Sequence, residues 1–190
     1  MRENETMTHF VLRLALTLLL ITGGMAAVLA GVNQLTAPRI EAARAEKTVA
    51  ALSEVLPDAA SAERLEEFPD ETGLVAEVYR SDTAYALKVT PVGFDNTITL
   101  MVGVGKGGTV LGISVISHTE TPNLGAVAAD PGPKGRVFRE QFVNERGSVA
   151  VTKDGGHIDA ITGATITSRA VAAGVNAALD CVASMEGGTA

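Results

Sequence analysis

The middle of the chain reads Met101-Val-Gly-Val-Gly-Lys-Gly-Gly-Thr-Val-Leu-Gly-Ile113, and this stretch decides the fold. Apolar, largely branched residues stand on both sides of the connection Gly105-Lys-Gly-Gly108. Glycine readily adopts the positive φ angles that a short loop between two strands demands. The stretch therefore predicts a β-hairpin, and with it a largely antiparallel sheet.

Further strands are predicted on the N-terminal side of this hairpin. Short apolar runs alternate there with turn-forming residues such as Ser81-Asp82 and Gly93-Phe-Asp-Asn96. The predicted strands are Leu74–Arg80, Ala84–Pro91, Thr97–Gly105 and Thr109–His118. The acidic stretch from Glu63 to Glu71 precedes them, and we interpret it as a solvated, loop-like surface because its acids lack the ligand spacing of a calcium loop.

Helical patterns follow the strands. A polar stretch from Thr119 to Gly135 leads to a predicted short helix at Arg136–Val143, then to a candidate strand at Ser148–Lys153. Ser168–Met185 is predicted to be a longer helix. Its apolar face comprises Val171, Val175, Ala178, Leu179 and Val182. Since strands and helices are segregated along the chain, the predicted class is α+β.

Near the N-terminus, Leu14–Val32 is an apolar segment of 19 residues without a charge. As a helix it would reach about 28 Å, enough to cross the hydrocarbon core of a lipid bilayer. A cleaved signal peptide is the alternative, but its apolar region is normally only about 7–15 residues long. The length favours a single transmembrane anchor. The basic residues on its two sides do not choose an orientation.

Pro38 stands where the first turn of a new helix would place a proline, and apolar residues recur at helical spacing from Ile40 to Leu56. This pattern predicts a separate juxtamembrane helix that ends before Pro57. The expected organisation is thus an N-terminal segment at 1–13, a transmembrane helix at 14–32, a juxtamembrane helix and linker at 33–72, and a folded domain at 73–190.

Composition excludes several classes of function. The formal net charge is −7 and aromatic residues make up 4% of the chain, so nucleic acid is not an expected partner. Cys181 is the only cysteine, which excludes a cysteine-ligated cluster built within this chain, and we expect it to be a buried apolar residue of the last helix. His9, His118 and His157 are scattered, so no metal site and no catalytic residue are predicted.

The stretch Asp159-Ala-Ile-Thr-Gly-Ala-Thr-Ile-Thr-Ser168 crowds hydroxyl and acidic side chains against the start of the last helix. Free backbone N–H groups and the positive end of the helix dipole favour an anion such as phosphate at this position. Gly163 and Ala164 allow a close approach of the backbone. On these grounds alone, the alternative that Thr167 or Ser168 merely caps the helix stays open.

The segment Asp159–Thr165 resembles the flavinylation motif Asp-x-x-Ser/Thr-Gly-Ala-Thr of the FMN-binding subunits of Rnf-type and sodium-pumping NADH:quinone oxidoreductase complexes. Every specified position matches. The resemblance implies that FMN is bound covalently to Thr165 through a phosphoester. It also implies maturation by an FAD:protein FMN transferase, with magnesium. The short length is more similar to the G subunit of Rnf-type complexes.

A second stretch, His118-Thr-Glu-Thr-Pro-Asn-Leu-Gly125, resembles the family's loop His-x-Glu-Thr-Pro-Gly-Leu-Gly. Asn123 replaces the usual glycine, and asparagine is the next most tolerant residue of a left-handed backbone. Leu124 can contact an isoalloxazine ring, whereas Thr121 and the backbone near Gly125 can hydrogen-bond to it. His118 and Glu120 are expected in the same pocket, either against the flavin or orienting the loop. The full set of predicted cofactor-binding residues is His118, Glu120, Thr121, Leu124, Gly125, Asp159, Thr162, Gly163, Ala164, Thr165, Thr167 and Ser168.

Lys153 and Arg136 are weaker candidates for this pocket. A cation near the N1–C2=O edge of a flavin would stabilise its reduced, anionic form, but each of the two residues is more often a surface charge.

The resemblance implies an electron-transfer subunit of a membrane-bound, ion-translocating oxidoreductase that works between ferredoxin and NAD. Its partners would be the other membrane subunits, and the domain at 73–190 would lie on the extracytoplasmic side of the cell (inner) membrane. The chain has no GxGxxG fingerprint that leads from a strand into a helix, and it has too few cysteines for clusters, so other subunits would handle NADH and ferredoxin. The alternatives are noncovalent FMN binding and a membrane-tethered binding or assembly module without covalent flavin.

Overall fold

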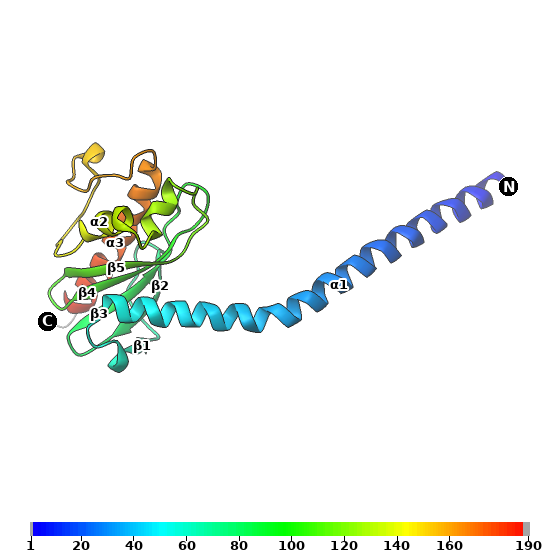
Figure 1. The fold of residues 1–190 in the computed structure, drawn as a ribbon. Coiled ribbons are helices and arrows are strands. Elements are labelled where there is room, and N and C mark those ends of the chain that lie inside the picture. The colour runs from blue at the N-terminus through cyan, green and yellow to red at the C-terminus, as the bar shows by residue number, and fades with distance from the viewer. Residues whose placement is uncertain (1, 188–190) are drawn as a thin grey trace. The chain divides into compact units, whose positions relative to one another are not determined.

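The computed structural model describes residues 2–187, with side chains from residue 9 onward. The chain divides into one unit that ends at Glu46 and a second that begins at Lys47. In chain order the helices are α1 (Arg2–Val55), η1 (Ala59–Ser61), η2 (Gly125–Ala129), α2 (Pro133–Glu140), η3 (Thr152–Asp154) and α3 (Thr165–Gly187). The strands are β1 (Glu63–Leu65), β2 (Val75–Arg80), β3 (Ala84–Val89), β4 (Thr99–Gly105) and β5 (Thr109–Ser117) (Figure 1).

The first unit consists of α1 as far as Glu46. Large apolar side chains are exposed all along it, and Leu20, for example, is 67% exposed. Among the described residues, α1 is the helix long and apolar enough to cross a membrane. A helix whose large apolar side chains are exposed in this way is suited to lipid, which supports the predicted anchor.

The prediction that Pro38 begins a new helix is wrong. Pro38 lies inside α1, which continues without interruption through residues 14–32 to Val55. Proline removes one backbone donor from a helix interior, and the residues on both sides have enough helix propensity to continue across that gap. The predicted end of this helix before Pro57 is confirmed, because α1 ends at Val55.

The second unit is built on an antiparallel sheet in the order β1-β2-β3-β4-β5 among the described residues. Each strand pairs with its neighbour in sequence, as in an antiparallel meander, and short turns join β2 to β3 and β4 to β5. Gly107 and Gly108 have φ angles of 101° and 73° in the β4–β5 turn. The hairpin predicted from the sequence is therefore confirmed, and so is the α+β class.

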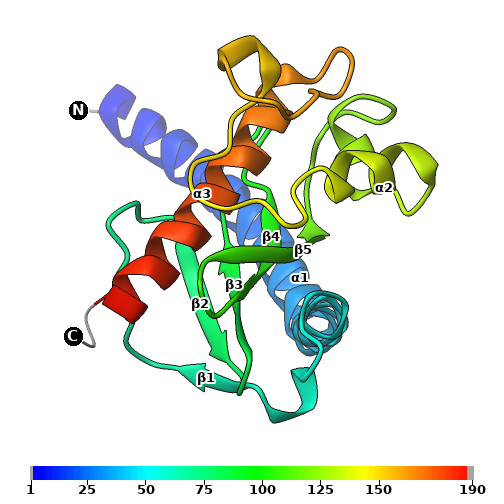
Figure 2. The same ribbon diagram turned by 90° about the vertical axis from the view of Figure 1, so that its left-hand side faces the viewer.

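Both faces of the sheet are covered. On one face, Leu87, Leu100 and Val102 pack against α3. On the other face, Ala84, Ala86 and Met101 contact the last two turns of α1 through residues such as Leu52 and Val55. Figure 2 shows α3 and this end of α1 on opposite sides of the strands. Neighbouring residues of one strand, such as Ala86 and Leu87, lie on different faces because successive side chains of a strand point to opposite sides of the sheet.

Two predicted elements differ from the structure. The candidate strand at Ser148–Lys153 is absent from the sheet: Val151 makes only an isolated bridge to Ile158, and Val149 hydrogen-bonds to the Asn176 side chain on α3. The chain then turns at Gly155, whose φ is 85°. Within the acidic stretch predicted to be a loop, Glu63–Leu65 forms the short edge strand β1. Contacts with residues elsewhere in the chain, not the local sequence pattern, decide both cases.

Two helices begin earlier than predicted. The predicted helix at Arg136–Val143 is α2, which has Pro133 in its first turn. The predicted helix at Ser168–Met185 is α3, and it begins at Thr165. Cys181 is buried in α3 as expected, and burial raises the pKa of its thiol to about 11, with a smaller contribution from the negative charge of Asp70.

Candidate functional site

A cavity of about 300 Å³ opens at the N-terminal end of α3. It lies where the turn before β4, the loop after β5, η3 and α3 meet. Its lining residues are Phe94, Leu124, Gly125, Lys153, Gly163, Ala164, Thr165, Ile166 and Thr167. We call it the Thr165 cavity. Five members of the predicted set besides Thr165 line it, from both of the motifs singled out in the sequence: Leu124, Gly125, Gly163, Ala164 and Thr167.

The turn that enters α3 gives the cavity its floor. Gly163 has a φ of 78°, a conformation that side chains disfavour, and an added Cβ there would lie 3.0 Å from Leu124 Cδ2. The Ala164 N–H donates to the Ile161 carbonyl at 2.9 Å, which closes the turn. Glycine is thus required both for the turn and for its contact with the Leu124 loop.

Thr167 and Ser168 do not cap the helix, contrary to one of the alternatives. Because α3 begins at Thr165, both residues lie inside its first turns and are buried. The Ser168 hydroxyl accepts from the Ile161 N–H at 3.0 Å and donates to the Ala164 carbonyl at 3.0 Å. It therefore braces the entering turn from within the helix, and the Thr165 hydroxyl remains at the cavity.

Thr165 is half-buried, and its hydroxyl accepts a hydrogen bond from the Lys153 Nζ at 3.1 Å. This contact crosses from η3 to the first residue of α3. The sequence alone leaves two roles open for Lys153, a cation near the flavin ring or a surface charge. The structure instead brings its ammonium to the oxygen that the resemblance identifies as the attachment atom.

A salt bridge stands one turn further along α3. Arg169 donates from Nε and Nη2 to the two carboxylate oxygens of Asp154, each at 2.6 Å. These hydrogen bonds and the charge of Arg169 lower the pKa of Asp154. The bidentate pair attaches η3 to α3 beside Thr165.

Glu120 is the buried centre of the site, with 5% of its surface exposed. It accepts from the Phe94 N–H at 2.8 Å, from the Asp95 N–H at 3.3 Å and from the Thr167 hydroxyl. A single carboxylate therefore connects the turn before β4, its own loop and α3. Of the two roles considered from the sequence, orienting the loop agrees with this position.

Glycines make room for that carboxylate. A Cβ at Gly93 would lie 2.2 Å from Glu120 Oε1, and one at Gly125 would lie 2.4 Å from Oε2. Both distances are far below van der Waals contact, so the last glycine of the loop motif is explained by its approach to Glu120. Asn123, which replaces the family's glycine, has a φ of 60°, as its left-handed tolerance predicts.

Other predicted residues lie outside the Thr165 cavity. Thr121 is exposed, and its carbonyl accepts from the N–H groups of Leu124 and Ala126, which shapes the loop. His118 is partly buried, and its Nδ1 has no hydrogen-bond partner among the described residues. Arg136 is exposed on α2 and lies 3.9 Å from Glu140.

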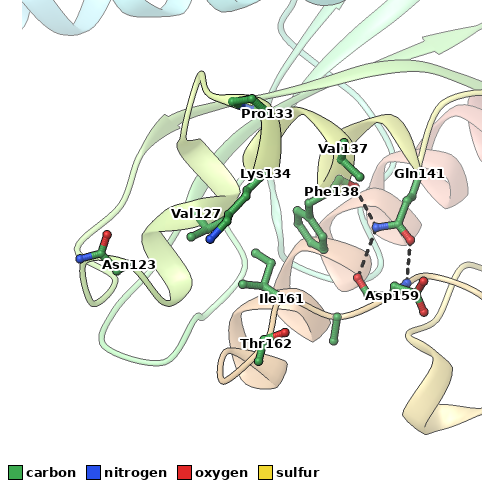
Figure 3. Close-up of a pocket in the computed structure, with 11 residues that line it drawn as sticks. Asn123, Val127, Pro133, Lys134, Val137, Phe138, Gln141, Asp159, Ile161 and Thr162 are labelled. Atoms are coloured by element: carbon green, nitrogen blue, oxygen red, sulfur yellow. Dashed lines mark hydrogen bonds between the residues drawn. The ribbon is translucent and has the colours of Figure 1, made fainter.

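Asp159 and Thr162 border a larger cavity, of about 480 Å³, beside α2 (Figure 3). Asp159 is held by its backbone, which exchanges hydrogen bonds of 2.7 and 3.3 Å with the Gln141 side chain. The walls are largely apolar and include Val137, Phe138 and Ile161. This α2 cavity lacks the Thr165 hydroxyl, so the smaller cavity is the better candidate for a tethered cofactor.

Sequence reasoning missed two residues of the Thr165 cavity, Phe94 and Ile166. Both are exposed, by 65% and 49%, and Leu124 beside them by 41%. Phe94 was recognised only as part of a turn. The sequence did hold one signal for Phe94: the chain has only 5 phenylalanines, and one of them stands in a turn, where a large apolar side chain is free to contact a ligand.

Comparison with known proteins agrees with this arrangement. The sequence model of the FMN-binding domain matches residues 93–180, which contain every residue of the Thr165 cavity. The model of the RnfG N-terminal region matches residues 7–55, nearly all of α1. Fold and site together define a protein with an apolar N-terminal helix and an FMN-binding domain.

Similar proteins narrow the class to one family. The chain is 32% identical to the G subunit of the ion-translocating oxidoreductase complex of Methanosarcina acetivorans, over 93% of this chain and 97% of the relative. It is 34% identical to the G subunit of the Na(+)-translocating ferredoxin:NAD(+) oxidoreductase complex of Acetobacterium woodii, over 87% and 88%. For the corresponding G subunit of Stutzerimonas stutzeri the identity is 35%, over 93% and 82%. The chain belongs to the family of G subunits of ion-translocating oxidoreductase complexes, and the resemblance stated from its motifs is confirmed.

Proposed function

We propose that this chain is an electron-transfer subunit in which FMN is esterified to Thr165, within a membrane complex that connects ferredoxin and NAD to ion transport. The observation that carries the proposal is the position of the Thr165 hydroxyl. It lies in a cavity, at the N-terminus of a long helix, with an ammonium group 3.1 Å away. Such a place favours a phosphate.

The residues present fit FMN. The Thr165 cavity, at about 300 Å³, lies at the lower end of the range for small-molecule sites, about 300–1,000 Å³, which suits a cofactor that stays partly exposed. Apolar side chains of Phe94, Leu124 and Ile166 would hold the ring, and Thr165 and Lys153 would hold the phosphate. FMN supplies reversible one- and two-electron transfer when bound.

The remaining residues act as a scaffold in this proposal. Glu120 fixes the relative position of the Phe94 turn and α3. The Gly163 turn keeps Leu124 against the start of α3. Covalent attachment would serve retention, because a tethered cofactor cannot diffuse away from a membrane surface where replacement is slow.

The proposed arrangement in the membrane keeps the boundaries expected from the sequence. Residues 1–13 lie in the cytoplasm and 14–32 cross the bilayer. The residues that follow, with the FMN-binding domain at 73–190 and the strand β1 that joins its sheet, lie outside the cytoplasm. Its partners are the other membrane subunits of the Rnf-type complex and, during maturation, an FAD:protein FMN transferase.

Intact mass spectrometry tests the attachment. After coexpression with the transferase, the wild-type chain should gain the mass of one FMN less water, and Thr165→Ala should abolish the gain. Thr83→Ala is the matched control, because Thr83 is an exposed threonine that belongs to neither motif and does not line the Thr165 cavity. An unmodified wild-type chain would contradict the proposal in favour of a tethered module without covalent flavin. Yellow protein that loses its colour on denaturation and filtration would indicate noncovalent binding instead.

Cysteine labelling tests the side of the membrane. The native Cys181 is buried and its thiol pKa is about 11, so it contributes little background. A membrane-impermeant maleimide added to intact cells should label Ser148→Cys and leave Glu5→Cys unlabelled. The opposite pattern would place the domain in the cytoplasm.

A further inference from the structure

Lys153 reaches Thr165 from a different element of the fold. The two residues are twelve positions apart, and Lys153 lies in the short turn η3. Val151, just before η3, forms an isolated β-bridge with Ile158, which follows the turn. Gly155 closes the turn with a φ of 85°. The backbone of η3 thus returns the chain toward the start of α3.

A second contact holds η3 in this place. Asp154, the neighbour of Lys153, makes its bidentate salt bridge with Arg169, which follows Thr165 by one helical turn. Consecutive side chains of η3 therefore contact α3 at Thr165 and at Arg169. An exposed lysine is ordinarily free to sample many rotamers, whereas this one extends from a turn that is clamped beside its acceptor.

We propose that Lys153 positions the Thr165 hydroxyl for flavin transfer and then holds the phosphate of the attached FMN. The inference rests on the proposed function, since it concerns the same attachment atom. It assigns Lys153 to the phosphate end of the cofactor and not to the ring edge considered from the sequence.

The chemistry agrees with a donor at this oxygen. An ammonium has only donors, so Lys153 fixes a lone pair of Thr165 Oγ1 and leaves the hydroxyl proton directed elsewhere. In the transfer, Thr165 Oγ1 forms a bond to the FMN phosphorus of FAD and the pyrophosphate P–O bond breaks, releasing AMP. The hydroxyl proton goes to a base of the transferase, because Lys153 has no acceptor.

The positive charge of Lys153 accounts for its second proposed role, holding the phosphate of the attached FMN. The product is a phosphodiester with one negative charge, attached to the first residue of α3. The Lys153 ammonium and the free N–H groups of the helix start face that charge. Phosphoryl transfer depends mainly on positioning and on stabilising charge at the phosphate oxygens, so a cation here should raise the rate.

The test uses the full-length chain in detergent, with purified transferase, FAD and magnesium. Initial rates of modification are followed by intact mass. Lys153→Met should lower kcat about five- to tenfold with little change in KM, as expected for the loss of one exposed, charge-assisted hydrogen bond. Lys153→Arg should restore the rate to within about twofold, because the guanidinium keeps both charge and donors.

Lys106→Met is the matched control. Lys106 is also exposed and donates from Nζ to a single oxygen, the Asp82 carbonyl. It lies just before β5, at the opposite end of this strand from the His118–Gly125 loop. Its substitution should leave the rate unchanged. Arg169→Gln should give a smaller loss than Lys153→Met, because it releases η3 but keeps the ammonium.

A footprint provides a readout independent of the rate. With an amine-acylating reagent, Lys153 should react readily in the unmodified chain and more slowly once FMN is attached, whereas Lys106 should react equally in both. A wild-type chain that is never modified overturns the proposed function and this inference with it. A wild-type chain that is modified, with Lys153→Met equally fast, overturns this inference alone. A rate loss without protection of Lys153 overturns its role toward the phosphate.

Discussion

Removing the buried carboxylate of Glu120 should destabilise the FMN-binding domain and separate the elements around the Thr165 cavity. In Glu120→Ala the N–H groups of Phe94 and Asp95 lose their acceptor, but both residues are exposed and water can replace it. The hydroxyl of Thr167 is different, since that residue is only 1% exposed. An unsatisfied buried donor costs about 1–3 kcal/mol, and hydrogen bonds to a charged group contribute about 1.5–3 kcal/mol each without adding fully.

We therefore expect Glu120→Ala to lower the free energy of unfolding by about 3 kcal/mol. This sum counts one fully buried hydrogen bond and two that water partly replaces. For a domain of this size, 1 kcal/mol corresponds to about 3 °C in Tm, so the melting temperature should fall by about 10 °C. Glu120→Gln should lose only about 1 kcal/mol, or about 3 °C, because its amide oxygen still accepts from the Phe94 N–H and the Thr167 hydroxyl can rotate to accept from the amide.

The assay is thermal unfolding of the unmodified full-length chain in detergent, followed by circular dichroism. Glu67→Ala, on the exposed acidic stretch, is the control for a lost negative charge and should melt with the wild type. The reasoning would be refuted if Glu120→Ala melted within about 1 °C of the wild type, or if Glu120→Gln lost as much as Glu120→Ala, since charge and not hydrogen-bond satisfaction would then dominate.

Other perturbations test the packing and the backbone. Gly103→Ala should lower the free energy of unfolding by about 1–3 kcal/mol, because its Cβ would lie 2.4 Å from the Val55 carbonyl oxygen. Gly105→Ala is the control and should be nearly neutral, since the nearest atom to its Cβ is 3.5 Å away; the Tm measures both variants. Cys181 should stay unmodified by iodoacetamide at pH 8 and react on denaturation, since burial raises its thiol pKa to about 11. Because that pKa lies above its unfolded value, Cys181 contributes stability below about pH 9 that is lost as the pH rises toward 11, and Cys181→Ala should reduce this alkaline loss. Asn123→Gly should be nearly neutral and Asn123→Val should lose about 1–2 kcal/mol, since φ at this position is 60°.

Each of these has an opposite result. Equal melting temperatures for Gly103→Ala and Gly105→Ala would show that the end of α1 shifts freely on the sheet. Rapid alkylation of native Cys181 would contradict its burial. A valine at position 123 that melts with the wild type would show that the loop relaxes out of the left-handed conformation.

The strand pattern was readable from sequence because it depends on neighbours along the chain. Leu74–Arg80 and Thr109–His118 were placed within one residue of β2 and β5, since branched residues and glycine turns act locally. Ser148–Lys153 has the same local composition but pairs with the side chain of Asn176 on α3. Pro38 carries a strong local preference for a helix start, and the helix around it overrides that preference.

As with the strands, the parts of the site that are contiguous in the sequence were predictable, and the parts contributed by distant elements were not. The Thr165 motif and the His118–Gly125 loop are contiguous stretches, and the structure brings Leu124 and Thr165 to one cavity. Ile166 directly follows Thr165, but nothing in the motif itself specifies it. Phe94 and Lys153 reach the cavity from other elements, so no spacing rule links them to Thr165. Glu120 could be named but not given its role, because the amide groups that it binds are 25 and 26 residues away.

By itself the sequence determined the apolar anchor helix, the antiparallel hairpin, the α+β class and the threonine expected to carry FMN. Those features depend on composition, short-range periodicity and contiguous motifs, which need no knowledge of distant contacts. Only the tertiary structure decided that Lys153 meets Thr165, that Glu120 joins the Phe94 turn to α3, and that small residues admit the end of α1 to the sheet. These contacts join residues that are far apart in the chain, and packing of the sheet against its two helices brings them together.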